Sequence, residues 1–182
     1  MQLKLHSLQV GRLSVNDLPP ASAVQAALDL GADNGATHLI TLQRADLEKA
    51  RVSGRLQLGA DGPLPVKASL QAASLEGRAW QGQLSATGPL SRLQLEAQVQ
   101  GEASTGRPAP TAQASATLQT WAAWPLAALQ LRTQKFDLAS LSARLPETAL
   151  DGQVQIQSTG LDQLAQAQLQ FSNALPGRLD QQ

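Results

Sequence analysis

Apolar and polar residues alternate along most of the chain with a period of two. In the segment 93–100, for example, Leu93, Leu95, Ala97 and Val99 alternate with Gln or Glu. Since successive side chains of a β-strand point to opposite faces, this pattern predicts strands with one apolar and one polar face. The polar positions carry mainly glutamine, of which the chain has 24, rather than charged residues.

Turn-forming residues separate the alternating segments. Gly, Pro, Asn and Asp supply the backbone conformations that tight turns require, and they cluster at residues 16–20, 33–35, 61–63, 88–89, 106–110 and 151–152. Short strands at this spacing predict an all-β sandwich, barrel or solenoid. The alternation outweighs the helix propensity of Ala, Leu and Gln.

One segment departs from the alternation. Leu138, Leu141 and Leu145 are three and four residues apart, which is a helical spacing, and Pro146 follows them. This predicts one short helix near residues 137–145 that ends before the proline.

A hairpin-like phrase occurs three times, beginning at Gly54, Gly82 and Gly152. Each copy reads as a strand, a turn that contains glycine, an apolar residue and a second strand. The apolar residues after the turns are Leu64, Leu90 and Leu161. A repeat of this size cannot bury its apolar face alone, so neighbouring copies are expected to stack.

Composition argues against several classes of protein. Fourteen basic and fourteen acidic residues give a formal net charge of zero, so the basic surface of a nucleic-acid-binding protein is not expected. There is no cysteine for disulfides or thiolate metal sites. No stretch approaches the roughly 18 apolar residues of a membrane-spanning helix. Residues 1–13 lack the apolar core of a signal peptide, and we expect the chain to be a segment of a longer protein.

No catalytic or metal-binding motif is evident. His6 and His38 are far apart and lack the neighbouring donors that a metal site requires. Phosphate-binding loops, nucleotide-binding glycine motifs and nucleophile motifs are missing from the sequence. We therefore expect neither an enzyme nor a bound cofactor. The most distinctive short stretch runs from Trp121 to Leu126 and includes Trp124; it could plug one end of the sheet or contact lipid headgroups, and the plug is favoured.

The apolar face predicted by the alternation is lightly built. It contains many alanines and few large side chains, so it would fill a two-sheet core poorly. It could pack on itself, or it could form an open trough for a hydrophobic ligand. In segments with weak alternation, such as 112–118, the sequence does not decide which residues face inward. The candidate lining residues of the trough are Leu56, Leu58, Val66, Leu70, Leu84, Leu93, Leu95, Val99, Leu118, Leu129, Leu131, Val154, Ile156, Leu169 and Phe171.

Three sequence features resemble the TamB-like translocation and assembly module proteins of the AsmA-like superfamily. They are the pattern FDLASL…LP…L.G at residues 136–152, the strand pairs rich in Gly and Leu that follow it, and the phrase TGPLSRLQL at residues 87–95. The resemblance is loose over most of the chain and strongest over residues 124–179.

The resemblance implies a long curled antiparallel or mixed sheet, a β-taco or solenoid-like groove whose concave face is apolar. It implies that residues 1–182 form a single elongated segment of a larger protein of the Gram-negative periplasm, anchored in the inner membrane. Such a groove would carry phospholipid acyl chains between the two membranes and support outer-membrane assembly. The implied partner is an Omp85-type outer-membrane barrel similar to TamA, contacted through other parts of the full-length chain.

Two alternatives remain open at this point. The chain could be a periplasmic scaffold or chaperone that assists insertion of outer-membrane β-barrel proteins, by offering an exposed strand edge. It could also be a structural β-solenoid with a self-packed core.

Overall fold

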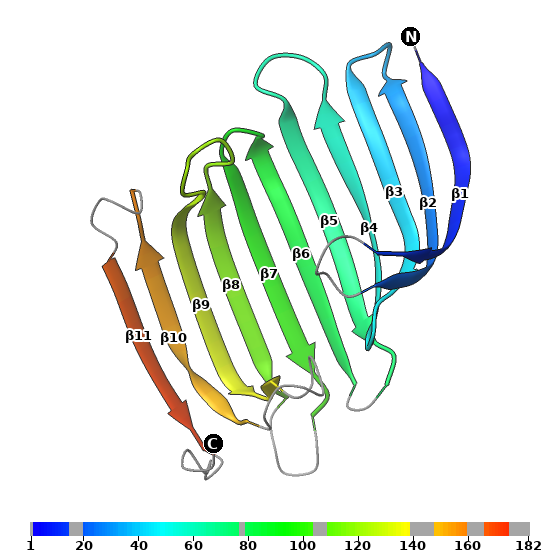
Figure 1. The fold of residues 1–182 in the computed structure, drawn as a ribbon. Coiled ribbons are helices and arrows are strands. Elements are labelled where there is room, and N and C mark those ends of the chain that lie inside the picture. Colours follow the sequence, from blue (N-terminus) through cyan, green and yellow to red (C-terminus); the bar gives the residue numbers. More distant parts are fainter. Residues whose placement is uncertain are drawn as a thin grey trace.

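The computed structural model describes residues 2–14, 20–76, 79–103, 109–138, 148–159 and 166–174. Within these ranges the protein is a single sheet of eleven strands (Figure 1), which confirms the predicted all-β class. The strands are β1 (Leu3–Leu13), β2 (Ala21–Ala32), β3 (Thr37–Asp46), β4 (Ala50–Gly59), β5 (Pro65–Ser74), β6 (Trp80–Pro89), β7 (Leu93–Gly101), β8 (Thr111–Leu118), β9 (Leu126–Phe136), β10 (Leu150–Gln157) and β11 (Gln166–Asn173).

The strands lie in the sheet in the order of the sequence, and every neighbouring pair is antiparallel. The sheet does not close, so β1 and β11 form its two edges (Figure 1). It is therefore the extended antiparallel sheet expected for a groove, and the described residues form neither a two-sheet sandwich nor a closed barrel.

The sequence predicts a short helix near residues 137–145, in the connection between β9 and β10. Residues 139–147 lie outside the described part of the chain, so this prediction stays untested. The two described ends of the connection are joined: Thr148 N donates to Asp137 Oδ1 at 3.0 Å, and Leu138 N donates to Thr148 Oγ1 at 2.9 Å. These bonds bring the start of β10 back to the end of β9.

The predicted turns at residues 33–35 and 61–63 are confirmed. Gly88 and Pro89 end β6, and the turn follows at residues 90–92. The turn expected at residues 151–152 is wrong, because both residues pair within β10. Asp33, Asn34 and Gly35 have positive φ between β2 and β3, and Gly62 does so between β4 and β5. Successive turns are also bonded to each other. For example, Leu90 N lies 3.0 Å from Leu64 O, which joins the apolar residues that follow two of the repeated turns. Leu161, the corresponding residue of the third copy, lies outside the described residues.

Irregular pairing is concentrated in β1–β3. The register shifts between Leu5 and Leu8 in β1, between Ser22 and Ala26 in β2, and between Leu42 and Ala45 in β3. Bulges of this kind increase the local twist and bend the strand. Figure 1 shows the corresponding effect, because the lower parts of β1 and β2 bend sharply while β5–β8 run nearly straight.

Asp46, at the end of β3, forms an ion-pair cluster with two arginines. Arg51 Nε lies 2.8 Å from Asp46 Oδ1, and Arg44 Nε lies 3.1 Å from the same oxygen. Hydrogen bonds from Arg51 and then Arg44 hold the pKa of the Asp46 carboxyl well below its usual value of 3.8. Since Asp46 pairs with Arg51 across β3 and β4, the cluster ties the end of this hairpin.

We expect this cluster to make the sheet sensitive to acid. The folded pKa of Asp46 is lowered, so its contribution to stability is present above an unfolded pKa of about 4 and is lost as the pH falls towards the folded value. Asp46→Asn should lower the urea midpoint at pH 7 and flatten its decline between about pH 4 and pH 2. Asp61→Asn, in the turn between β4 and β5, is the matched control and should keep the wild-type profile. An Asp46→Asn variant with a wild-type midpoint and decline would contradict the role of the cluster.

Candidate functional site

The register of the sheet places all fifteen candidate lining residues on one side, which we call the apolar face. One continuous row of paired residues illustrates this: Leu5, Leu28, Ile40, Leu56, Ala68, Ala86, Leu95, Ala116, Leu129, Ile156 and Ala167. Directly paired residues of an antiparallel sheet point to the same side, so a row that contains Leu95 fixes the apolar face across all eleven strands.

The fifteen candidates lie in four rows on this face. Leu56, Leu95, Leu129 and Ile156 belong to the row just described, and Leu70, Leu84, Leu131, Val154 and Leu169 form the next row. Two outer rows hold the remaining candidates: Leu58, Val66, Leu93 and Leu118 on one side, and Val99 and Phe171 on the other. The same register turns Ala112, Ala114 and Ala116 towards the apolar face, which settles the orientation of segment 112–118.

The apolar face also extends over β1–β3, which contain none of the fifteen candidate lining residues. Leu5, Leu28, Ile40 and Leu42 pair in register with the candidate residues of the later strands. The alternation of these residues is visible in the sequence. Bulges, however, change whether odd-numbered or even-numbered residues face the apolar side within one strand. The strand register was therefore needed to place these residues on the same face as the candidates of β4–β11.

No described residue forms a second layer over the apolar face. Strands contact only their sequence neighbours in any extensive way, and the described residues contain no large side chain that is fully buried. Val66 and Val154 are each 8% exposed, whereas Leu84 is 36% and Leu169 66% exposed. The described apolar residues therefore pack side by side in one layer and keep an open outer surface.

Two glycines on the apolar face give space to larger neighbours. A Cβ at Gly54 would overlap the carbonyl oxygen of Ser69 and the side chain of Leu70, and a Cβ at Gly152 would overlap the side chain of Phe171. Gly54 pairs directly with Leu70 and Gly152 with Phe171. The larger side chain of each pair thus lies over the glycine. This keeps the apolar face level at positions where a second large side chain would protrude.

We expect Gly54→Ala to destabilise the sheet by about 1–3 kcal/mol, because the added methyl group overlaps backbone atoms of β5 that cannot move away alone. Urea unfolding followed by circular dichroism measures the loss. Gly11→Ala in β1 is the control, since a Cβ there meets no atom within 4 Å. Equal midpoints for the two variants would show that Gly54 is not needed for close packing.

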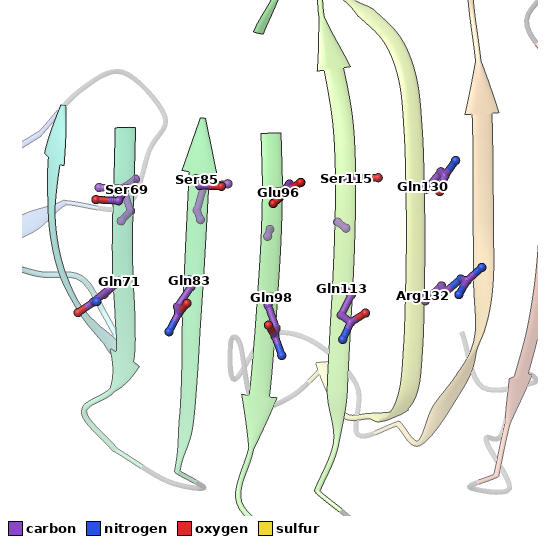
Figure 2. Close-up of a pocket in the computed structure, with 14 residues that line it drawn as sticks. Ser69, Gln71, Gln83, Ser85, Glu96, Gln98, Gln113, Ser115, Gln130 and Arg132 are labelled. Carbon is purple, nitrogen blue, oxygen red and sulfur yellow. The ribbon is translucent and has the colours of Figure 1, made fainter. Parts of the chain in front are cut away.

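The polar face contains a hollow over β5–β9. Two neighbouring rows line it, one with Ser69, Ser85, Glu96, Ser115 and Gln130, and the other with Gln71, Gln83, Gln98, Gln113 and Arg132 (Figure 2). The hollow is shallow and open, with a volume of about 560 Å³. Sequence reasoning did not anticipate it, because a depression between hydroxyl and amide side chains depends on how the strands twist.

The sequence favours a role for Trp121 as a plug at the end of the sheet, and the structure contradicts this prediction. It lies in the connection between β8 and β9 and is 74% exposed, and Trp124 is 36% exposed. The connection is held instead by a hydrogen bond from Gln119 N to Pro125 O at 2.7 Å, and Thr120 Oγ1 donates to Leu90 O in the next turn. Backbone and hydroxyl groups close this turn, so the indole of Trp121 is left facing solvent.

Two side-chain polar atoms, Trp80 Nε1 and Thr133 Oγ1, are buried without a hydrogen-bond partner among the described residues. Thr133 pairs with Ala112 and with Gly152, and Trp80 lies two residues before Gly82, so both belong to the apolar face. A buried hydroxyl or indole N–H without a partner costs on the order of 1–3 kcal/mol.

Thr133→Val should raise the free energy of unfolding by about 1 kcal/mol, because it removes a buried hydroxyl while conserving shape and strand propensity. Urea denaturation provides the measurement. Thr111→Val, at the polar-face start of β8, is the control and should change stability little. A loss of stability in Thr133→Val would mean that the hydroxyl has a partner that the structure does not show.

The described residues carry no cluster of three or more potential metal ligands. His38 has a structural role, since its Nδ1 accepts a hydrogen bond from Gly31 N at 3.1 Å beside the turn between β2 and β3. Among the described residues no helix is long and apolar enough to cross a membrane. The apolar face offers hydrophobic contact, and the polar face offers mainly amide and hydroxyl groups for hydrogen bonding.

Comparison with protein-family models, with curated proteins and with solved structures found no match for this chain. The resemblance to TamB-like proteins therefore remains a prediction from the sequence.

Proposed function

We propose that the apolar face binds phospholipid acyl chains and that the protein is a segment of a bridge through which lipid passes between two membranes. The observation that carries this proposal is the continuous apolar face of eleven strands, which no described residue covers. Contiguous exposed apolar surface on a protein is typical of binding sites for hydrophobic partners.

The chemistry of the face suits acyl chains. Each methylene group removed from water contributes roughly 0.8 kcal/mol, so an acyl chain gains affinity along its whole length. The rows repeat at a strand spacing of about 4.8 Å with similar Leu, Ala and Val side chains in each strand. A chain lying across the strands would therefore meet nearly equivalent contacts after each step, which favours sliding over binding at one fixed position.

The wider context of the proposal comes from the sequence resemblance. A TamB-like protein would be anchored in the inner membrane, extend through the periplasm and act with an Omp85-type barrel in the outer membrane. In that setting the glutamine-rich polar face is exposed to the periplasm while the apolar face holds lipid.

A second candidate function is a scaffold that assists insertion of outer-membrane β-barrel proteins. The observation in its favour is that β11 is the last strand of the described sheet and that all eight of its residues are exposed. An extended peptide can add to such an edge through backbone hydrogen bonds. Capture of unfolded barrel peptides without bound lipid would favour this function.

The lipid proposal is tested by Leu95→Asp, which places a charge in the middle of the central apolar row. We expect native mass spectrometry of protein purified gently from a Gram-negative periplasm to show phospholipid adducts on the wild type. The fraction carrying lipid should fall about tenfold or more in Leu95→Asp, because an unpaired carboxylate is strongly disfavoured against hydrocarbon.

Gln94→Asp is the matched control, because residue 94 lies next in the same strand and faces the opposite side. It should retain the wild-type adducts. Equal loss of lipid in both variants, with both still folded by circular dichroism, would contradict binding on the apolar face.

A further inference from the structure

The connection between β8 and β9 exposes two tryptophans at one end of the sheet. Trp121 is 74% exposed and Trp124 is 36% exposed. Residues 119–125 contain no charged side chain, and the turn is closed by its own backbone, through the hydrogen bond from Gln119 N to Pro125 O. The indoles are therefore not needed to close the turn, and their exposed apolar surface is available to a partner.

This turn continues the apolar face. Leu118 and Leu126, which flank the turn, pair with each other on that face, and Leu118 also pairs with Leu93. Trp121 thus lies at the rim of the sheet, where an apolar row ends and water begins. An indole combines an apolar ring with a polar N–H, so it is favoured at a boundary of this kind.

A cation lies in the neighbouring turn. Thr120 Oγ1 donates to Leu90 O, so the turn at residues 90–92 lies beside the tryptophan turn, at the upper end of the sheet in Figure 1. Arg92 is exposed and is the one charged residue of these two turns. Its backbone is fixed by a hydrogen bond from Arg92 N to Pro89 O at 2.8 Å, whereas its guanidinium forms no ion pair with a described residue.

The opposite end of the sheet presents its aromatic and basic side chains differently. Phe136, at the end of β9, is 6% exposed, and the indole nitrogen of Trp80, at the start of β6, is buried. Arg44 and Arg51 at that end are already paired with Asp46. The exposed indoles and the unpaired Arg92 guanidinium therefore distinguish the rim formed by residues 90–92 and 119–125.

We infer that the phospholipid headgroup lies at this rim, with its phosphate at Arg92 and its glycerol region at Trp121, while the acyl chains lie on the apolar face. The inference rests on the proposed function and assigns an orientation to the bound lipid. Guanidinium groups bind phosphate through charge-assisted hydrogen bonds. Indoles are enriched where the hydrocarbon of a bilayer meets its headgroups. Since the rim and the apolar rows both run across the strands, a headgroup can move along the rim while the acyl chains slide.

Fluorescence quenching tests this orientation on the whole chain. Trp80→Phe/Trp124→Phe leaves Trp121 as the single tryptophan, and Trp121→Phe/Trp124→Phe leaves Trp80. Each variant is loaded with phosphatidylcholine that carries a nitroxide either on the headgroup or near the end of an acyl chain. We expect the headgroup label to quench Trp121 more strongly than the acyl-chain label does. It should leave Trp80 unquenched, because β6 separates the two ends of the sheet by ten residues, or about 30 Å.

Stronger quenching of Trp121 by the acyl-chain label would overturn the inference, as would equal quenching of both tryptophans by the headgroup label. Native mass spectrometry of the same samples separates the two proposals. Lipid adducts without quenching of Trp121 would refute the orientation and leave the proposed function intact. The absence of lipid adducts would refute both.

Arg92→Gln tests the phosphate contact. We expect its dissociation constant for a short-chain phosphatidylglycerol, titrated through Trp121 fluorescence, to rise about two- to fivefold, since a contact between solvent-exposed charges is weak. Arg55→Gln, on the polar face of β4, is the matched control and should keep the original constant. An unchanged constant in Arg92→Gln would contradict the contact. Inorganic phosphate alone should leave Trp121 fluorescence unchanged, and a response equal to that produced by the lipid would show a site for free anions instead of a headgroup site.

Discussion

The structure depends on the register of strand pairing. Side chains alternate along a strand, so a slip of one residue between two strands would exchange the apolar and polar faces from that point onwards. From β4 to β8 the pairs follow without any shift, and Leu, Ala and Val stay on one side of the sheet while Gln, Ser and Thr stay on the other. Both faces described above, the apolar one and the polar one with its hollow, exist because this phase is kept.

Much of the fold could be predicted from the sequence, because alternation and turn chemistry are local signals. Leu93 to Val99 alternate without interruption, and Asp33-Asn34-Gly35 supplies the positive φ angles of a tight turn. The orientation of Ala112 to Ala116 could not be predicted, because the methyl group of alanine carries too little apolar surface to mark a buried face. It is fixed by pairing with Val99, Ala97 and Leu95.

Other features depend on long-range geometry and could not be found in this way. The bulges of β1–β3 displace the apolar pattern, and the hollow beside Glu96 requires five strands at once. The exposure of Trp121 also contradicts the expectation that the stretch from Trp121 to Leu126 plugs one end of the sheet. Backbone hydrogen bonds within the turn were sufficient to close it.

A single layer with one apolar face needs something to cover that face, because exposed apolar surface favours association with another hydrophobic surface. The side chains on this face are small and repetitive, and glycine lies opposite the larger ones at Gly54 and Gly152. This gives a smooth surface without the deep, individual pockets that specific recognition of one rigid partner requires. On this ground we propose a flexible hydrocarbon chain, and not a second folded domain, as the partner of the apolar face.

The most direct test is to cross-link the protein with a phospholipid that carries a photoactivatable group at the end of an acyl chain, and then to map the modified residues by peptide mass spectrometry. Our account predicts adducts on the apolar rows, for example at Leu95, Leu131 and Val154, distributed over several strands. Adducts confined to the polar hollow at Gln98 and Gln113, or the absence of any adduct in lipid-saturated protein, would contradict it.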